Sequence, residues 1–94
     1  MRDVSITILV PNSLKDLLRG NNQATCAGKT IKECISDLDS KFPGFSNNIL
    51  NEKGEVNKSF MIFLDGQNIL ALNALDTSVK DGDEVSIIPF AAGG

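Results

Sequence analysis

The sequence has no histidine, tryptophan or tyrosine among its 94 residues. Histidine is the most common general base and the most common metal ligand, so its absence argues against acid–base catalysis and against a zinc site. Basic residues are also few, because 9 Lys and Arg stand against 12 Asp and Glu and leave a net charge of −3. Phosphate binding requires a surplus of basic side chains, and we therefore expect no nucleic-acid partner.

Long apolar runs are absent as well. No stretch approaches the ~18 apolar residues that a membrane span needs, and the start of the chain, MRDVSITILV, lacks the apolar core of a signal peptide. We therefore expect no membrane association and a cytoplasmic location. Gly20, Gly28 and Gly44 stand singly, so no glycine-rich loop for a nucleotide phosphate is predicted. The absence of histidine and of a glycine-rich nucleotide-binding loop together predicts that the chain is not an enzyme.

Cysteine occurs only twice, at Cys26 and Cys34. Two thiols at this spacing, in a chain without histidine, do not make a zinc site. The main prediction is a pair of free, buried side chains in a reducing compartment, because unpaired cysteine is among the most buried residue types. A disulfide or a reactive thiol is the alternative.

A small acidic cluster, formed by Asp81, Asp83 and Glu84 with Asp76 nearby, lies towards the end of the chain. Carboxylates are good ligands for hard cations. Asp-Gly pairs, however, strongly favour turns, and Gly82 follows Asp81 directly. We therefore predict a solvated turn here and no metal site.

The clearest predicted element is a helix over Thr30–Phe42. Apolar residues recur there with helical period and form one stripe, made of Ile31, Cys34, Ile35, Leu38 and Phe42. Thr30 is a capping residue, and Glu33 lies where its side chain can reach back to the cap amide. Pro43 and Gly44 are predicted to end the helix.

Five further segments have the composition of strands, namely Val4–Val10, Ala24–Gly28, Phe60–Leu64, Gln67–Leu70 and Glu84–Ile88. Asp65-Gly66 fits a type I′ hairpin turn, and Pro89 is predicted to end the last strand because it has no amide donor. The first and last strands are strongly apolar, which favours parallel, central neighbours. A short turn or 3₁₀ segment precedes the last strand.

This order of elements predicts an α+β fold, a small roll in which a four- to five-stranded mixed sheet packs on one main helix. We expect one domain over residues 1–89, with Asn51–Ser59 as a flexible surface loop, followed by a flexible tail over residues 90–94.

The tail ends in PFAAGG, whose small side chains and two glycines favour neither helix nor strand. From Pro89 to Gly94 it can extend on the order of 17 Å, enough to enter a narrow channel in another protein. A terminal carboxylate there can attack the α-phosphate of ATP, in a site whose Mg²⁺ and cationic groups the other protein supplies. The resulting acyl-adenylate is open to a sulfur nucleophile, which leaves a thiocarboxylate.

Two stretches, DGDEVSIIPFAAGG at Asp81–Gly94 and TIKECISDLDSKFPGF at Thr30–Phe45, resemble the ubiquitin-like sulfur carriers of the MoaD/ThiS type. The ending looks closest to MoaD-like members, including those of the CysO kind that serve cysteine biosynthesis. The resemblance implies a β-grasp fold. It also implies that Gly94 is adenylated and converted to a thiocarboxylate, and that Gly93, Ala92 and Ala91 are required for this activation.

The partners that the resemblance implies are an adenylating E1-like enzyme of the MoeB/ThiF type, which uses ATP and Mg, and a sulfur-accepting synthase. That synthase is a molybdopterin synthase large subunit or a cysteine synthase, and a thiamine pathway remains open. This chain would bind no cofactor itself and would act as a carrier, or as the small subunit of a molybdopterin-synthase-type complex. Phe90, at the root of the tail, contacts the partner or folds back on its own sheet.

Two other functions remain as alternatives. A ubiquitin-like modifier would use the same activated Gly94 to join lysines of other proteins, because an amine can replace sulfur as the nucleophile. An interaction module would bind a partner through its sheet alone, with an incidental tail.

Overall fold

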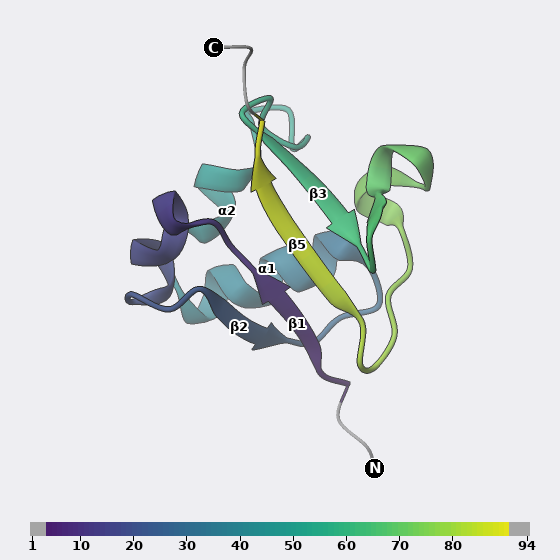
Figure 1. The fold of residues 1–94 in the computed structure, drawn as a ribbon, viewed down its shortest axis with the longest axis horizontal. Coiled ribbons are helices and arrows are strands. Elements are labelled where there is room, and N and C mark those ends of the chain that lie inside the picture. Colours follow the sequence, from purple (N-terminus) through teal and green to yellow (C-terminus); the bar gives the residue numbers. More distant parts are fainter. Residues whose placement is uncertain (1–3, 91–94) are drawn as a thin grey trace.

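The structure is a computed structural model that describes residues 4–90, and the predictions on Ala91, Ala92, Gly93 and Gly94 lie outside these residues. Five strands form one sheet in the order β2-β1-β5-β3-β4. The strands are β1 (Ile6–Leu9), β2 (Gln23–Cys26), β3 (Phe60–Leu64), β4 (Gln67–Asn68) and β5 (Glu84–Pro89). The main helix lies behind the sheet in the view of Figure 1. The predicted α+β roll with a mixed sheet on one main helix is confirmed.

Strand β5 occupies the centre of the sheet. It pairs in parallel with β1, where Ile8 lies opposite Val85, and antiparallel with β3, where Ile62 lies opposite Ile87. The first and last strands are therefore parallel neighbours, as their apolar composition predicts. At the far end of β3, Asp65 and Gly66 have φ values of 49° and 89°, the two positive angles that a type I′ turn requires.

Helix α1 (Ile31–Lys41) agrees with the prediction to within one residue at each end, and Thr30 caps it by accepting a hydrogen bond from the Glu33 amide at 3.2 Å. The predicted hydrogen bond between the Glu33 side chain and the Thr30 amide was wrong. Its Oε1 accepts from the amide of Lys29 at 2.8 Å, not from that of Thr30. The backbone at Thr30 is extended, with φ −135° and ψ 166°, and this brings the preceding amide within reach of the helix.

Four short helical segments accompany α1, namely the 3₁₀ helices η1 (Asn12–Leu18), η2 (Ile69–Ala71) and η3 (Ala74–Asp76) and the helix α2 (Phe45–Ile49). The turn or 3₁₀ segment before the last strand is thus confirmed, whereas η1 and α2 were not predicted. Gly44, with φ 96°, turns the chain from the end of α1 directly into α2. Within residues 4–90 no helix is long and apolar enough to cross a membrane.

Helix α1 packs against one face of the sheet, and the hydrophobic core lies between the two. Ile6, Ile8 and Ile62 from the sheet and Ile35 and Leu38 from α1 are all at most 1% exposed. The core also contains Cys26 and Cys34. Both are free and buried, as the main prediction states.

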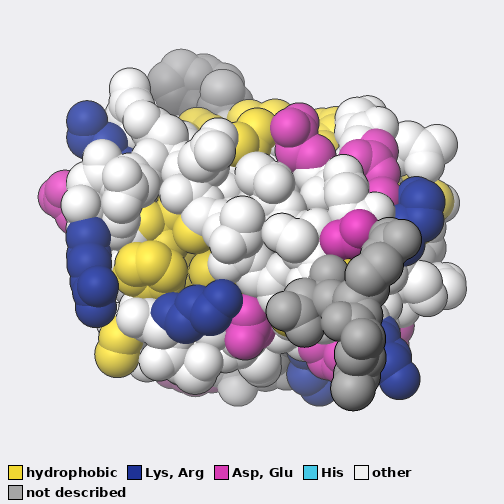
Figure 2. Space-filling model, turned by 90° about the horizontal axis from the view of Figure 1, so that it is seen from below, with side chains coloured by type: hydrophobic (Ala, Val, Ile, Leu, Met, Phe, Trp, Pro, Cys, Tyr) yellow, Lys and Arg dark blue, Asp and Glu magenta, His cyan; other side chains and the backbone are white. Residues whose placement is uncertain are grey.

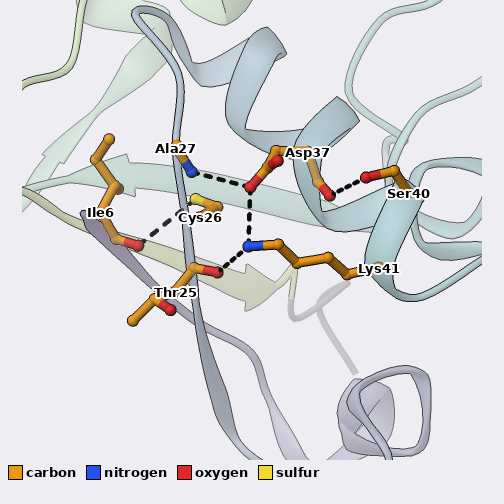
Figure 3. A network of polar contacts seen from close by, with 7 residues as sticks. All are labelled: Ile6, Thr25, Cys26, Ala27, Asp37, Ser40 and Lys41. Atoms are coloured by element: carbon orange, nitrogen blue, oxygen red, sulfur yellow. Dashed lines mark hydrogen bonds and ion pairs between the residues drawn. The ribbon is translucent and has the colours of Figure 1, made fainter. Parts of the chain in front are cut away.

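Helix α1 also binds the outer edge of β2, as Figure 3 shows. Asp37 Oδ2 accepts from the amide of Ala27 at 3.0 Å, and Lys41 Nζ donates to the carbonyl of Thr25 at 3.3 Å. Lys41 and Asp37 are themselves paired at 3.1 Å. The pKa of Asp37 is lowered, mainly by the hydrogen bond from the Ala27 amide. Burial acts in the opposite direction, and the contact with Lys41 lowers the pKa further. These contacts block part of a sheet edge that would otherwise be open to another chain.

We predict that Leu38→Ala costs about 2–5 kcal/mol of the free energy of unfolding, because Leu38 is fully buried and the substitution leaves a cavity. Urea denaturation followed by circular dichroism measures this loss. Ser36→Ala is the matched control on the exposed side of α1, and we expect it to change the free energy by less than about 0.5 kcal/mol. Equal losses in the two variants would contradict the assignment of the buried face.

Candidate functional site

The end of β5 is where the chain leaves the sheet. Strand β5 includes Pro89, one residue beyond the predicted end at Ile88, and the Phe90 amide then donates to the carbonyl of Ser59 at 2.7 Å. Alternate residues of a strand direct their amides to opposite sides, so position 89 faces β1. The pairing of β1 with β5 covers only Glu84 to Ser86, and the missing donor of Pro89 therefore breaks no bond of the sheet.

The loop over residues 51–59 supports this end of β5. Asn51 Oδ1 accepts from the amides of Lys53 and Glu55, at 2.9 and 3.0 Å, and closes the loop on itself. The amide of Asn57 donates to the carbonyl of Ile49 at 2.7 Å, and Asn57 Oδ1 accepts from the amide of Ser59 at 2.9 Å. The segment predicted as a flexible surface loop is thus a hydrogen-bonded turn that positions the Ser59 carbonyl for Phe90.

The face of the sheet opposite α1 carries an apolar surface beside this exit point, and we call it the outer face. Alternation along β1, β3 and β5 places on it the side chains of Leu9, Met61, Phe63, Ser86 and Ile88. Among the described residues no helix covers β1, β5 and β3 on this side (Figure 1). Ile88 is 40% exposed, which is unusual for a large apolar side chain in a central strand.

Phe90 itself lies at the rim of a groove of about 680 Å³ that is lined by Val56, Phe60, Met61, Leu70 and Leu75. Its side chain is 54% exposed. Phe90 therefore has one surface towards its own domain and another free for contact, so both of the roles expected for it remain open. Sequence reasoning did not identify Met61, Phe63 and Ile88 as surface residues, since apolar positions in a strand look like core.

The turn that leads into β5 differs from the solvated turn predicted for it, because Asp83 is only 6% exposed. Its carboxylate accepts from Lys80 Nζ at 2.8 Å and from the Lys80 amide at 2.9 Å. Burial raises the pKa of Asp83, but the hydrogen bonds from Lys80 outweigh it, so the pKa lies below its usual range. Next to it, Asp65 Oδ1 accepts from the amide of Glu84 at 2.9 Å. These bonds fix the start of β5.

The acidic side chains of the described residues do not gather into a metal-ligand cluster. No group of three or more Cys, Asp or Glu side chains in this part of the chain is arranged to hold a metal ion. On the face that Figure 2 shows, acidic and basic side chains are interspersed, with hydrophobic side chains between them.

Comparison with known proteins agrees with this architecture. The sulfur carrier protein CysO of Mycobacterium tuberculosis is 27% identical over 93 residues, which cover 97% of this chain and all of that protein. A chain of the BexX/CysO complex of Amycolatopsis orientalis has a TM-score of 0.88 at 26% identity, with 95% of this chain and 99% of that chain covered. Small archaeal modifier protein 1 of Methanosarcina acetivorans has a TM-score of 0.79 at 26% identity, and both chains are covered completely.

The fold is therefore a β-grasp fold of the ubiquitin-like class, as the sequence resemblance implies. The model of the ThiS family matches residues 8–94, and the chain belongs to this family. Its homologues include sulfur carrier proteins. The match extends through Gly94, so the tail that sequence reasoning selected lies within the matched region even though Ala91–Gly94 fall outside the described residues.

We predict that Asp83→Asn lowers the free energy of unfolding at pH 7 by about 1–3 kcal/mol, because hydrogen bonds to a charged partner are lost from a buried position. The lowered pKa of Asp83 stabilises the fold at neutral pH, and this contribution is lost as the pH falls below about 4. Urea denaturation of both proteins at pH 7 and pH 3 should show the difference shrinking at the lower pH. A difference that stays constant with pH would contradict the ionic role.

Proposed function

We propose that this protein is a sulfur carrier whose Gly94 carboxylate is activated and sulfurated by partner enzymes. The observation that carries the proposal is the position of Phe90, half exposed at the end of the central strand in a β-grasp domain of the ThiS family. The remaining residues, Ala91 to Gly94, follow directly from this point at the surface. Homology to CysO supports the same role.

The chemistry needs no catalytic residue in this chain. A carboxylate oxygen of Gly94 attacks the α-phosphorus of ATP, the bond to the bridging oxygen breaks, and pyrophosphate leaves. A sulfur nucleophile then attacks the acyl carbon, AMP leaves, and the carboxylate has exchanged one oxygen for sulfur. The partner supplies Mg²⁺ and positive charge to stabilise the leaving phosphates. Small residues at Ala91, Ala92 and Gly93 let the backbone enter a narrow site.

The activating partner in this proposal is an E1-like adenylating enzyme of the MoeB/ThiF type, and it docks on the outer face and Phe90. An exposed apolar surface next to the reactive end is what a protein partner recognises. The Amycolatopsis orientalis neighbour, found in complex with BexX, supports binding of such a domain by a second protein. The acceptor of sulfur is a cysteine synthase or a molybdopterin synthase large subunit, and the likeness to CysO favours the first.

We expect intact-mass spectrometry of the protein from its native host to show a fraction heavier by the difference between one sulfur and one oxygen atom. With the adenylating enzyme, ATP and a sulfur donor present, this fraction should grow. Deletion of Gly94 should abolish it, and thermal melts of the deleted and full-length chains should coincide because a terminal residue adds little to stability. Sulfur carriage has no basis if the thiocarboxylate never forms under these conditions.

A ubiquitin-like modifier is the second candidate, favoured by the similarity to small archaeal modifier protein 1. It would use the same acyl-adenylate but transfer Gly94 to a lysine amine, forming an amide bond. Immunoblots of host lysate distinguish the two functions. A ladder of larger species that disappears when Gly94 is deleted supports conjugation, whereas a single band together with the thiocarboxylate mass supports sulfur carriage alone.

The docking surface is tested with Ile88→Glu on the outer face. Since a charge at a buried interface is costly, we expect the rate of adenylation to fall roughly tenfold or more at subsaturating protein. Val4→Glu is the matched control, because Val4 is also 40% exposed. The parallel pairing of β1 with β5 places Val4 at the end of the sheet away from Phe90. Equal rates for the two variants, with unchanged melting temperatures, would exclude this face as the docking site.

A further inference from the structure

Neither the fold nor the proposed function accounts for the two cysteines. Cys26 is the last residue of the edge strand β2, and Cys34 lies one turn into α1. Both are free, and their side chains are 2% and 0% exposed. They are brought together from a strand and a helix in the layer between sheet and helix, where an ordinary small apolar residue would pack equally well.

The backbone around Cys26 is bound directly to the helix that carries Cys34. On either side of Cys26, the carbonyl of Thr25 accepts from Lys41 and the amide of Ala27 donates to Asp37 (Figure 3). The chain stays close to the helix beyond this point as well. A Cβ atom at Gly28 would lie only 2.9 Å from the backbone nitrogen of Cys34, so the chain after β2 passes the first turn of α1 more closely than a residue with a side chain would allow.

Both thiols lie in this clamp between β2 and α1. Cys26 Sγ donates to the carbonyl of Ile6 at 3.5 Å, which orients it inside the core. Hydrogen bonding between the thiols is the main cause that raises the pKa of Cys26, and burial adds to it. The same bond lowers the pKa of Cys34, against the effect of burial.

We propose that Cys26 and Cys34 form a reversible dithiol–disulfide site that accepts a two-electron oxidant of the peroxide class and, when oxidised, ties the edge strand β2 to α1. The chemistry of this site does not depend on sulfur carriage. The two free cysteines lie on different elements that hydrogen bonds on both sides of Cys26 hold against each other, and a disulfide between them would add a covalent link at this point.

The reaction balances with peroxide as the only added reagent. Cys34 Sγ attacks one peroxide oxygen, the O–O bond breaks, and one water leaves, giving a sulfenic acid. Cys26 Sγ then attacks Cys34 Sγ, the S–O bond breaks, and a second water leaves with formation of the S–S bond. Both thiol hydrogens end in water, the sulfurs are oxidised and the peroxide is reduced. A thiol reductant reverses the change by exchange.

Access to the buried thiols comes through the edge of the sheet. Strand β2 is four residues long, and within residues 4–90 its only sheet partner is β1, from Gln23 opposite Leu9 to Cys26 opposite Ile6. Edge elements of this kind open locally at a smaller free energy than the whole domain. We therefore expect oxidation of the folded protein to be slow and limited by opening of β2, and the disulfide, once formed, to suppress that opening.

The test is to treat the folded, reduced protein with hydrogen peroxide, remove the oxidant, unfold the chain and label it with N-ethylmaleimide. We expect an intact mass lower by two hydrogen atoms and no maleimide on either cysteine. The oxidised protein should melt roughly 10 °C higher than the reduced protein, and dithiothreitol should restore both the labelling and the lower melting temperature.

Cys26→Ser and Cys34→Ser are matched variants that each retain one thiol, and neither should show the mass loss or the shift in melting temperature. If either variant fails to fold, the mass, labelling and melting temperature of oxidised and reduced wild-type protein still decide the test. Recovery of two maleimide labels after peroxide treatment overturns the proposal, because the thiols are then inert. Disulfide-linked dimers, or a lower melting temperature after oxidation, overturn it as well.

Discussion

The pairing of β5 with both of its neighbours is the constraint on which the rest of the structure depends. Strand β5 joins the parallel ladder to β1 and the antiparallel ladder to β3, so it links the two halves of the sheet. Its start is fixed by the bonds of Asp83 to Lys80 and of Asp65 to Glu84. Its end pairs with the start of β3, and the Phe90 amide then donates to the Ser59 carbonyl. A strand that is held at both ends thus leads into the proposed reactive tail.

The two faces of this sheet serve different purposes. On one face Ile6, Ile62 and Val85 are buried against α1, and the hydrophobic effect of this layer supplies most of the stability of so small a domain. On the outer face Ile88 is as apolar as they are but stays partly exposed. An uncovered apolar face gains nothing for the isolated fold and favours association, so its position beside Phe90 is consistent with the docking role proposed for it.

The sequence was most informative where one physical signal extended over many residues. The stripe that includes Ile35 and Leu38 is long enough to define α1, and Thr30 marks its start. Helix α2 has only five residues, too few for a helical period to emerge, so the sequence predicts the break at Gly44 but not the helix that buries Phe45 after it. Asp83 looks like a turn residue in sequence. In the folded chain it is buried and accepts hydrogen bonds from the Lys80 amide and side chain, which the sequence alone does not show.

The outer face illustrates the same limit at the candidate site. In FMIFL every position is apolar, so the pattern of β3 predicts pairing on both sides but does not indicate which face stays uncovered. That choice is made by the number of helices available, because a single long helix can cover one face only. Met61 and Ile88, directly opposite each other in the sheet, are left on the uncovered side. The proposed docking surface is therefore a consequence of having one main helix for five strands, and the central position of β5 places it next to Phe90.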